Sequence, residues 1–286
     1  MSHIISRHDM IALIGRRFQA LGTIHSGLLF DLTREESAMR DGIEAEDIHR
    51  FRVEIKKLRA FLRLVKPGQR HVLPTHLREY YRSLGAIRNL QLQELRLLDA
   101  ATDDLRRLPV YSGLLRSQLS VALRQANGLA SDVLLPHAQS RALEDLPAEL
   151  GTETIRDFLW KASTGIQSLM APDAMLTDRN MHELRKILKD LNYNQKYVAH
   201  ESAHILPPAL TAGKEKIEPL LVLLGRFQDC CSGLQLLRPA GDSHEQRLLA
   251  ATSREWKREK ENIRRQFRVT YIPIFQRLFI SGQQQL

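Results

Sequence analysis

The chain has 286 residues and a formal net charge of +9 at pH 7, because 42 Lys and Arg outnumber 33 Asp and Glu. A hydrophobic content of 43% with 26% charged residues is typical of a globular chain of one large or two small domains, which excludes intrinsic disorder. No apolar run has membrane-spanning length, and adjacent Cys230 and Cys231 form no disulfide framework, so a cytoplasmic protein with a polyanionic or acidic partner is expected.

Apolar residues recur at three- and four-residue spacing along most of the chain, and this spacing predicts helices and no strand. In chain order, the expected helices cover residues 8–40, 46–66, 74–99, 111–135, 152–170, 180–204, 214–237 and 245–280. The predicted fold class is therefore all-α. A natural seam near residues 146–152 favours two packed four-helix bundles, residues 1–150 and residues 151–286.

A repeat relates the two predicted bundles. At an offset of 133 residues, the segment that begins at His49 matches the segment that begins at His182. This offset pairs His49 with His182, Arg52 with Arg185, Lys56 with Lys189 and Arg63 with Lys196. One helix further on, Leu84-Gly85-Ala86-Ile87-Arg88-Asn89 matches Leu224-Gly225-Arg226-Phe227-Gln228-Asp229 at an offset of 140. Two matched features in the same order predict an internal duplication with pseudo-symmetric bundles.

Helical geometry places the basic residues of each repeat on one side and the apolar residues on another. The first basic stripe comprises His49, Arg52, Lys56, Arg59 and Arg63, and the second comprises His182, Arg185, Lys189 and Lys196. The expected core stripes comprise Phe51, Ile55, Leu58, Leu62 and Val65 in the first copy, and Leu184, Leu188, Leu191 and Val198 in the second. Like charges at this spacing repel, so a stripe built twice favours an anionic ligand over a solvated face.

The ends and glycines of these helices support the same interpretation. Asp47 is the expected N-cap of the first basic helix, and Thr177 or Asp178 that of the second. His49 and His182 then fall in a first turn, where free N–H groups favour an anion. Gly85 and Gly225 are interpreted as sites of close helix contact.

Over residues 9–280 the chain resembles the CHAD (conserved histidine α-helical domain) family. The resemblance rests on the motif His-x-x-Arg-Val-x-x-Lys-Lys-Leu-Arg from His49 to Arg59, on the two Leu-Gly segments and on the second motif, His-x-Leu-Arg-x-x-x-Lys. The resemblance implies that two four-helix bundles with pseudo-twofold symmetry together form one CHAD domain. It also implies binding of inorganic polyphosphate, with localisation to polyphosphate granules in some members. The implied ligand-facing residues are His49, Arg52, Lys56, Lys57, Arg59, Arg63, His182, Arg185, Lys186, Lys189 and Lys196.

The chain departs from the family pattern at several positions. Asp190 and Asn192 replace expected basic residues, which predicts weaker phosphate binding by the second half, and Asn89 stands where Asp is usual. The Glu-x-Glu-x-Lys motif of a triphosphatase domain fused to some members is not found, so the resemblance implies no catalytic residue and no cofactor. Because phosphate favours protonated histidine, binding is expected to be tighter at about pH 6 than at about pH 8.

Two other functions compete with this one. A basic surface also suits nucleic acid, although the stripes offer few aromatic side chains for base stacking. A zinc hydrolase is the other alternative, because His200-Glu201-Ser202-Ala203-His204 matches His-Glu-x-x-His, with Glu218 as a conceivable third ligand. The motif lies at the end of a predicted helix before Pro207, and the sheet that frames such sites is not predicted.

Overall fold

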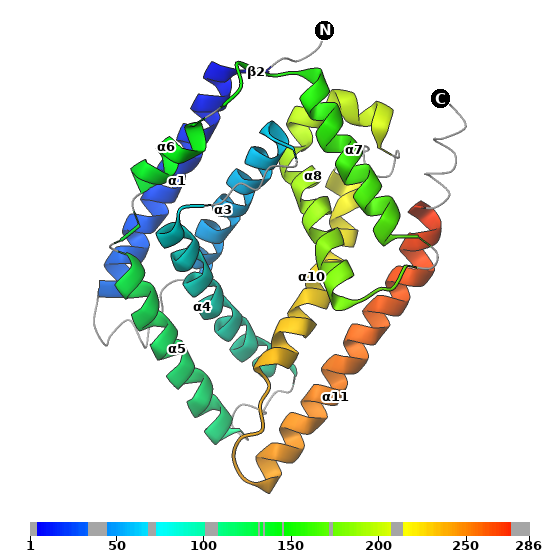
Figure 1. The fold of residues 1–286 in the computed structure, drawn as a ribbon. Helices are drawn as coiled ribbons and strands as arrows, with labels where there is room; N and C mark the ends of the chain where they lie inside the picture. Colours follow the sequence, from blue (N-terminus) through cyan, green and yellow to red (C-terminus); the bar gives the residue numbers. More distant parts are fainter. Residues whose placement is uncertain are drawn as a thin grey trace.

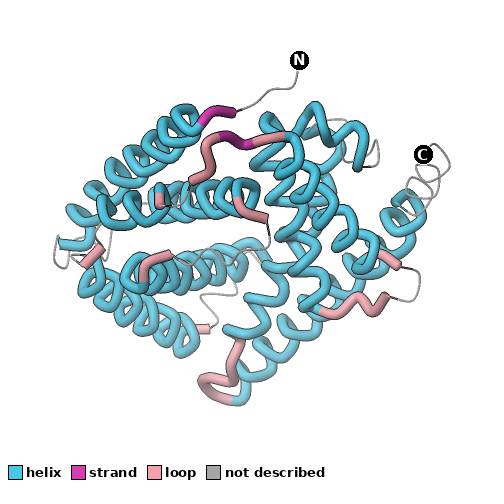
Figure 2. The backbone as a smooth tube through the Cα atoms, turned by 45° about the horizontal axis from the view of Figure 1, so that its top comes forward, coloured by secondary structure: helices cyan, strands magenta, loops and turns pink. Residues whose placement is uncertain are grey.

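The structure, a computed structural model, describes residues 5–33, 45–67, 73–100, 108–130, 132–133, 135–144, 146–171, 174–206 and 214–275. Almost all of this part is helical, as Figure 2 shows, which confirms the predicted all-α class. The helices are α1 (Arg7–Thr33), α3 (Ala45–Val65), α4 (Thr75–Ala100), α5 (Pro109–Ala130), α6 (Leu135–Leu143), α7 (Thr152–Leu169), α8 (Asp178–Ile205), α10 (Lys214–Leu236) and α11 (Ser243–Gln266).

The structure differs from the predicted elements in three places. The helix predicted over residues 111–135 ends at Ala130, and the short helix α6 follows it. Strands β1 (Ile5–Ser6) and β2 (Glu149–Leu150) pair antiparallel, so the expectation of no strand is wrong. Two residues are too few for a period-two pattern to show in the sequence. After α11, the segment Phe267–Tyr271 winds as a π-helix.

Four helices occupy the middle of the molecule: α3, α4, α8 and α10 (Figure 1). Helices α1, α5 and α6 flank them on one side, and α7 and α11 flank them on the other. Helix α3 packs against α8 and α7, while α4 packs against α10. These contacts join the two predicted bundles through their basic helices.

The buried apolar side chains form one continuous cluster that extends from Met10 on α1 to Phe275 near the C-terminus. The predicted core stripes of α3 and α8 are confirmed, since Phe51, Ile55 and Leu188 are fully buried and the other stripe residues nearly so. One core thus holds both halves together. The internal duplication and the boundary at residue 150 stay predictions.

The starts of the two basic helices differ. Thr177 accepts a hydrogen bond from the backbone N–H of Asn180 (3.1 Å), which confirms it as the N-cap of α8. Asp47 lies inside the first turn of α3, which begins at Ala45, so its assignment as an N-cap is wrong. Asp47 accepts a charge-assisted hydrogen bond from Arg50 instead. In both helices the carboxylate in the first turn complements the helix dipole.

Candidate functional site

Basic side chains from α3 and α8 come within electrostatic reach of one another where these helices pack. Burial, together with the positive charges of Arg52, Lys189 and Arg185, lowers the pKa of Lys56 on α3 to about 7. Burial and, after it, the charge of Arg185 lower the pKa of Lys189 on α8 to about 8, while Asp229 acts in the opposite direction. The two basic stripes therefore meet and repel each other.

His49 and Arg88 extend the same group of charges. The pKa of His49 is lowered, first by partial burial and then by Arg88 on α4, with Lys56 and Lys189 adding smaller effects and Glu46 opposing them. Burial also lowers the pKa of Arg52, and Arg88 contributes there too. We call His49, Arg52, Lys56, Arg88, Arg185 and Lys189 the cation cluster. The sequence placed Arg88 in the repeat but did not identify it as a ligand, because its position depends on how α4 packs.

Arg52 is held in place by three contacts with α4. Its Nη1 donates a hydrogen bond to the backbone carbonyl of Tyr81 (2.8 Å), and its guanidinium carbon lies 4.6 Å from the centre of the Tyr81 ring. The guanidinium also lies directly over Gly85, where a Cβ atom would be 3.0 Å from Cζ and would overlap Nη1. Gly85 therefore makes room for a side chain of α3, which specifies the close contact expected from the sequence.

Arg185 is less constrained. A Cβ atom at Gly225 would lie 3.8 Å from Nη2 of Arg185, which is ordinary van der Waals contact. The Nε atom of Arg185 is buried and finds no acceptor in the described part of the chain. A buried donor without an acceptor is unfavourable, and a bound anion would supply one.

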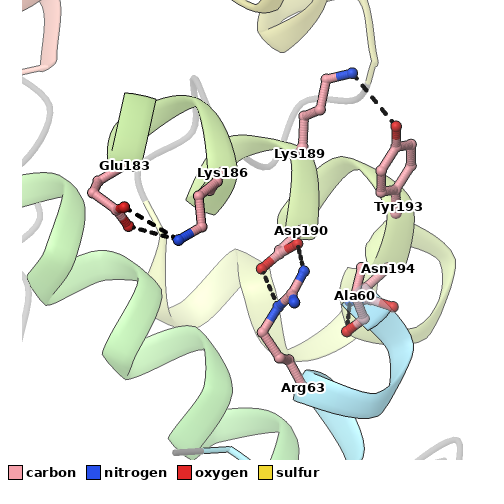
Figure 3. Close-up of polar contacts among 8 residues, drawn as sticks. All are labelled: Ala60, Arg63, Glu183, Lys186, Lys189, Asp190, Tyr193 and Asn194. Carbon is pink, nitrogen blue, oxygen red and sulfur yellow. Dashed lines mark hydrogen bonds and ion pairs between the residues drawn. The ribbon is translucent and has the colours of Figure 1, made fainter. Parts of the chain in front are cut away.

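Other predicted ligand residues contact acidic side chains. Lys57 donates to Glu54 (2.6 Å) and Lys186 donates to Glu183 (2.9 Å). Figure 3 shows the side chain of Lys186 directed toward Glu183 and that of Lys189 directed toward Tyr193, away from Lys186. The charges that lower the pKa of Lys56 are those of Arg52, Lys189 and Arg185, and not those of these two lysines. These two residues lie beside the cation cluster rather than within it.

The remaining predicted ligand residues have other contacts. Arg63 on α3 forms a bidentate ion pair with Asp190 on α8, with Nε 2.6 Å from Oδ2 (Figure 3). Lys196 lies over the Tyr197 ring at 4.7 Å, and Arg59 is partly exposed on α3. His182 is exposed, and its Nδ1 lies 2.8 Å from Oε1 of Gln228.

The zinc-hydrolase motif lies in the last turns of α8. Glu201 is buried and accepts a hydrogen bond from Nε of Arg156 (2.9 Å), while Nδ1 of His200 lies 3.1 Å from its other oxygen. The side chain of His204 lies outside the described residues. Within the described residues, no three His, Cys, Asp or Glu side chains gather as a metal site.

Comparisons with known proteins agree with the fold. The family model of the CHAD domain matches residues 24–238. A crystal structure of the CHAD domain from the plant Ricinus communis is similar, with a TM-score of 0.51 and 17% sequence identity. That match covers 94% of this chain and 92% of the plant chain. A search of curated proteins finds no match. No helix in the described ranges is long and apolar enough to cross a membrane.

Proposed function

Because the chain belongs to the CHAD domain family, we propose that it binds inorganic polyphosphate through the cation cluster and does so without catalysis. The observation that carries this proposal is the burial of Lys56 among Arg52, Arg185 and Lys189. Burial first, and these positive charges after it, lower the pKa of Lys56 to about 7. Four cations held together in this way repel one another in the free protein. A ligand with several closely spaced negative charges relieves that repulsion.

The geometry suits a linear polyanion better than a single phosphate. The cation cluster draws on α3, α4 and α8, so successive phosphates along one chain reach side chains of different helices. Arginine forks bind phosphate oxygens in pairs, and the cluster contains three arginines: Arg52, Arg88 and Arg185. Inorganic polyphosphate offers one negative charge per phosphate and no base for which a stacking surface is needed. We further propose a cytoplasmic location, with polyphosphate granules as a site of action.

A direct test measures the affinity of a labelled long-chain polyphosphate for the wild type and for Arg52→Ala/Arg185→Ala. Each arginine–phosphate contact contributes about 1.5 kcal/mol or more, so the double variant is expected to bind about 100-fold more weakly. Arg254→Ala/Lys257→Ala is the matched control, because both residues are exposed on α11 and the change in net charge is the same. Equal losses in the two double variants would show attraction by net charge alone and contradict the proposal.

The non-catalytic part of the proposal has its own measurement. Prolonged incubation of polyphosphate with the protein, with and without added zinc, is expected to release no orthophosphate and to leave the chain length unchanged. Phosphate release that disappears in His200→Ala would favour the hydrolase alternative.

A further inference from the structure

The cation cluster has two sides: α3 and α4 form one, and α8 and α10 form the other. The residues of α4 and α10 at matching positions differ. At the offset of 140 residues found in the sequence, Tyr81 corresponds to Leu221, Arg88 to Gln228 and Asn89 to Asp229. Tyr81 and Arg88 act on Arg52, whereas Asp229 acts on Arg185. These differences change the surroundings of the cation cluster, while Arg52 and Lys56 of α3 stay matched by Arg185 and Lys189 of α8.

The first difference concerns how firmly each arginine is held. Arg52 stacks on the Tyr81 ring and donates to the Tyr81 carbonyl, so its guanidinium is oriented before any ligand arrives. Leu221 offers Arg185 no ring to stack on, and the Nε of Arg185 has no acceptor in the described part of the chain. A side chain that is already ordered loses less conformational entropy on binding.

The second difference concerns charge. Arg88 adds a positive charge next to His49 and Arg52. At the matching position the neutral Gln228 contacts His182. The negative charge of Asp229 acts on Arg185 and Lys189 and, less strongly than on Arg185, on Arg88. The charged neighbours that act on Lys56 are all cations. At these two positions, α4 carries two more unit charges of positive sign than α10, one from each substitution.

We infer that the two sides of the cation cluster are unequal subsites, and that a short polyphosphate first occupies the α3–α4 side at Arg52, Lys56 and Arg88. This inference rests on the proposed function. The sequence also predicted a weaker second half, through Asp190 and Asn192, but the carboxylate of Asp190 pairs with Arg63 of the first half. The structure instead assigns the difference to Asp229, Gln228 and Leu221 on α10.

The test uses two pairs of matched variants, with tripolyphosphate and long-chain polyphosphate as probes in a calorimetric titration at low salt. The first pair is Arg52→Gln and Arg185→Gln, which remove the same charge from equivalent positions. Arg52→Gln is expected to weaken tripolyphosphate binding about ten-fold or more, and Arg185→Gln less than about three-fold.

The second pair changes charge without removing a basic side chain. Asn89→Asp adds to the α3–α4 side the carboxylate found on the other side, and is expected to weaken binding about three- to ten-fold. Asp229→Asn removes that carboxylate and is expected to strengthen binding by a similar factor. Thermal unfolding of each variant shows whether it is folded, and the Asp229→Asn gain cannot arise from misfolding.

The outcomes separate this inference from the proposed function. Losses that are larger for Arg52→Gln and Asn89→Asp, with a gain for Asp229→Asn, support unequal subsites. Equal losses for the two arginine variants with either probe overturn the inference while polyphosphate binding stands. A folded wild type that binds neither probe overturns the proposed function and the inference together.

Discussion

Gly85 and Gly225 occupy matching positions in the two repeats, yet only one of them is closely covered by an arginine. The guanidinium of Arg52 lies where a Cβ atom at Gly85 would be, whereas Arg185 leaves ordinary contact distance above Gly225. Alanine has a higher helix propensity than glycine by about 1 kcal/mol. The same substitution at the two positions therefore separates an effect on helix stability from an effect on arginine placement.

Gly85→Ala is expected to weaken polyphosphate binding several-fold, because the added methyl group displaces the flexible end of Arg52 from the Tyr81 carbonyl. Its Tm is expected to change little, since the displacement offsets the gain in helix propensity. Gly225→Ala, the control, is expected to raise the free energy of unfolding by up to about 1 kcal/mol and to keep wild-type binding. Paired titrations and thermal unfolding measure both quantities. Unchanged binding by Gly85→Ala would show that the placement of Arg52 is unimportant.

Lys56 makes the stability of the ligand-free protein depend on pH. Its pKa is about 7 in the folded protein and 10.5 without the fold, so between these values the unfolded chain holds more protons. The contribution of Lys56 to stability is therefore least favourable below pH 7 and improves as pH rises toward 10.5. Lys56→Met is expected to exceed the wild type in Tm at about pH 6 and to lose that advantage at about pH 10.

Bound polyphosphate favours the protonated forms of Lys56 and His49, which the ligand-free protein disfavours. The increase in Tm on adding polyphosphate is therefore expected to be larger at about pH 6 than at about pH 9 in the wild type. In Lys56→Met the difference between the two pH values is expected to shrink. A wild-type increase that does not change with pH would contradict the participation of both residues.

At the scale of the elements, the crossing of α3 and α8 joins the two predicted halves. The buried amide of Asn194 donates to the carbonyl of Ala60 (2.8 Å), the rings of Phe61 and Tyr197 lie 5.3 Å apart, and Arg63 pairs with Asp190. Arg63 therefore stabilises the contact between helices. Although Arg63 belongs to the basic stripe, its guanidinium is paired with the Asp190 carboxylate and is not free for a ligand.

A double-mutant cycle on Arg63→Gln and Asp190→Asn tests this structural role. The bidentate geometry predicts a coupling of about 1 kcal/mol in the free energy of unfolding, at the upper end for partly exposed pairs. Arg63→Gln alone is expected to lower stability while it leaves polyphosphate affinity within about two-fold. A large loss of affinity without a loss of stability would return Arg63 to the ligand set proposed from the sequence.

The element scale also shows what the sequence could predict. Residue spacing predicted the helices and their buried faces. The reason is that Phe51, Ile55 and Leu58 fall on one face of their helix through their spacing alone, whatever the helix packs against. The position of Arg88 and the pairing of Arg63 with Asp190 depend on which helices pack together, and no single helix encodes that. Helix α6 and the β1–β2 pair were missed because each is too short for its pattern to show.

At the scale of the whole molecule, acidic residues neutralise many of the basic ones. On α11, Lys260 and Arg264 both pair with Asp178 at the start of α8, at 2.9 Å and 2.7 Å. Glu259 of α11 accepts from Arg96 of α4 and from Arg226 of α10. These pairs fasten α11 to the centre of the molecule. In the cation cluster, by contrast, positive charges act on one another: Arg52, Lys189 and Arg185 all lower the pKa of Lys56.

The central claim is that the cation cluster, and not net charge, selects inorganic polyphosphate over other polyanions. The measurement that tests it most directly is a competition titration, in which single-stranded RNA, duplex DNA or short phosphates displace labelled long-chain polyphosphate at ~0.15 M salt. We expect unlabelled polyphosphate to compete best, and we expect this preference to be lost in Arg52→Ala/Arg185→Ala. Equal or better competition by RNA, unchanged in the double variant, would contradict the claim and favour a nucleic-acid-binding protein.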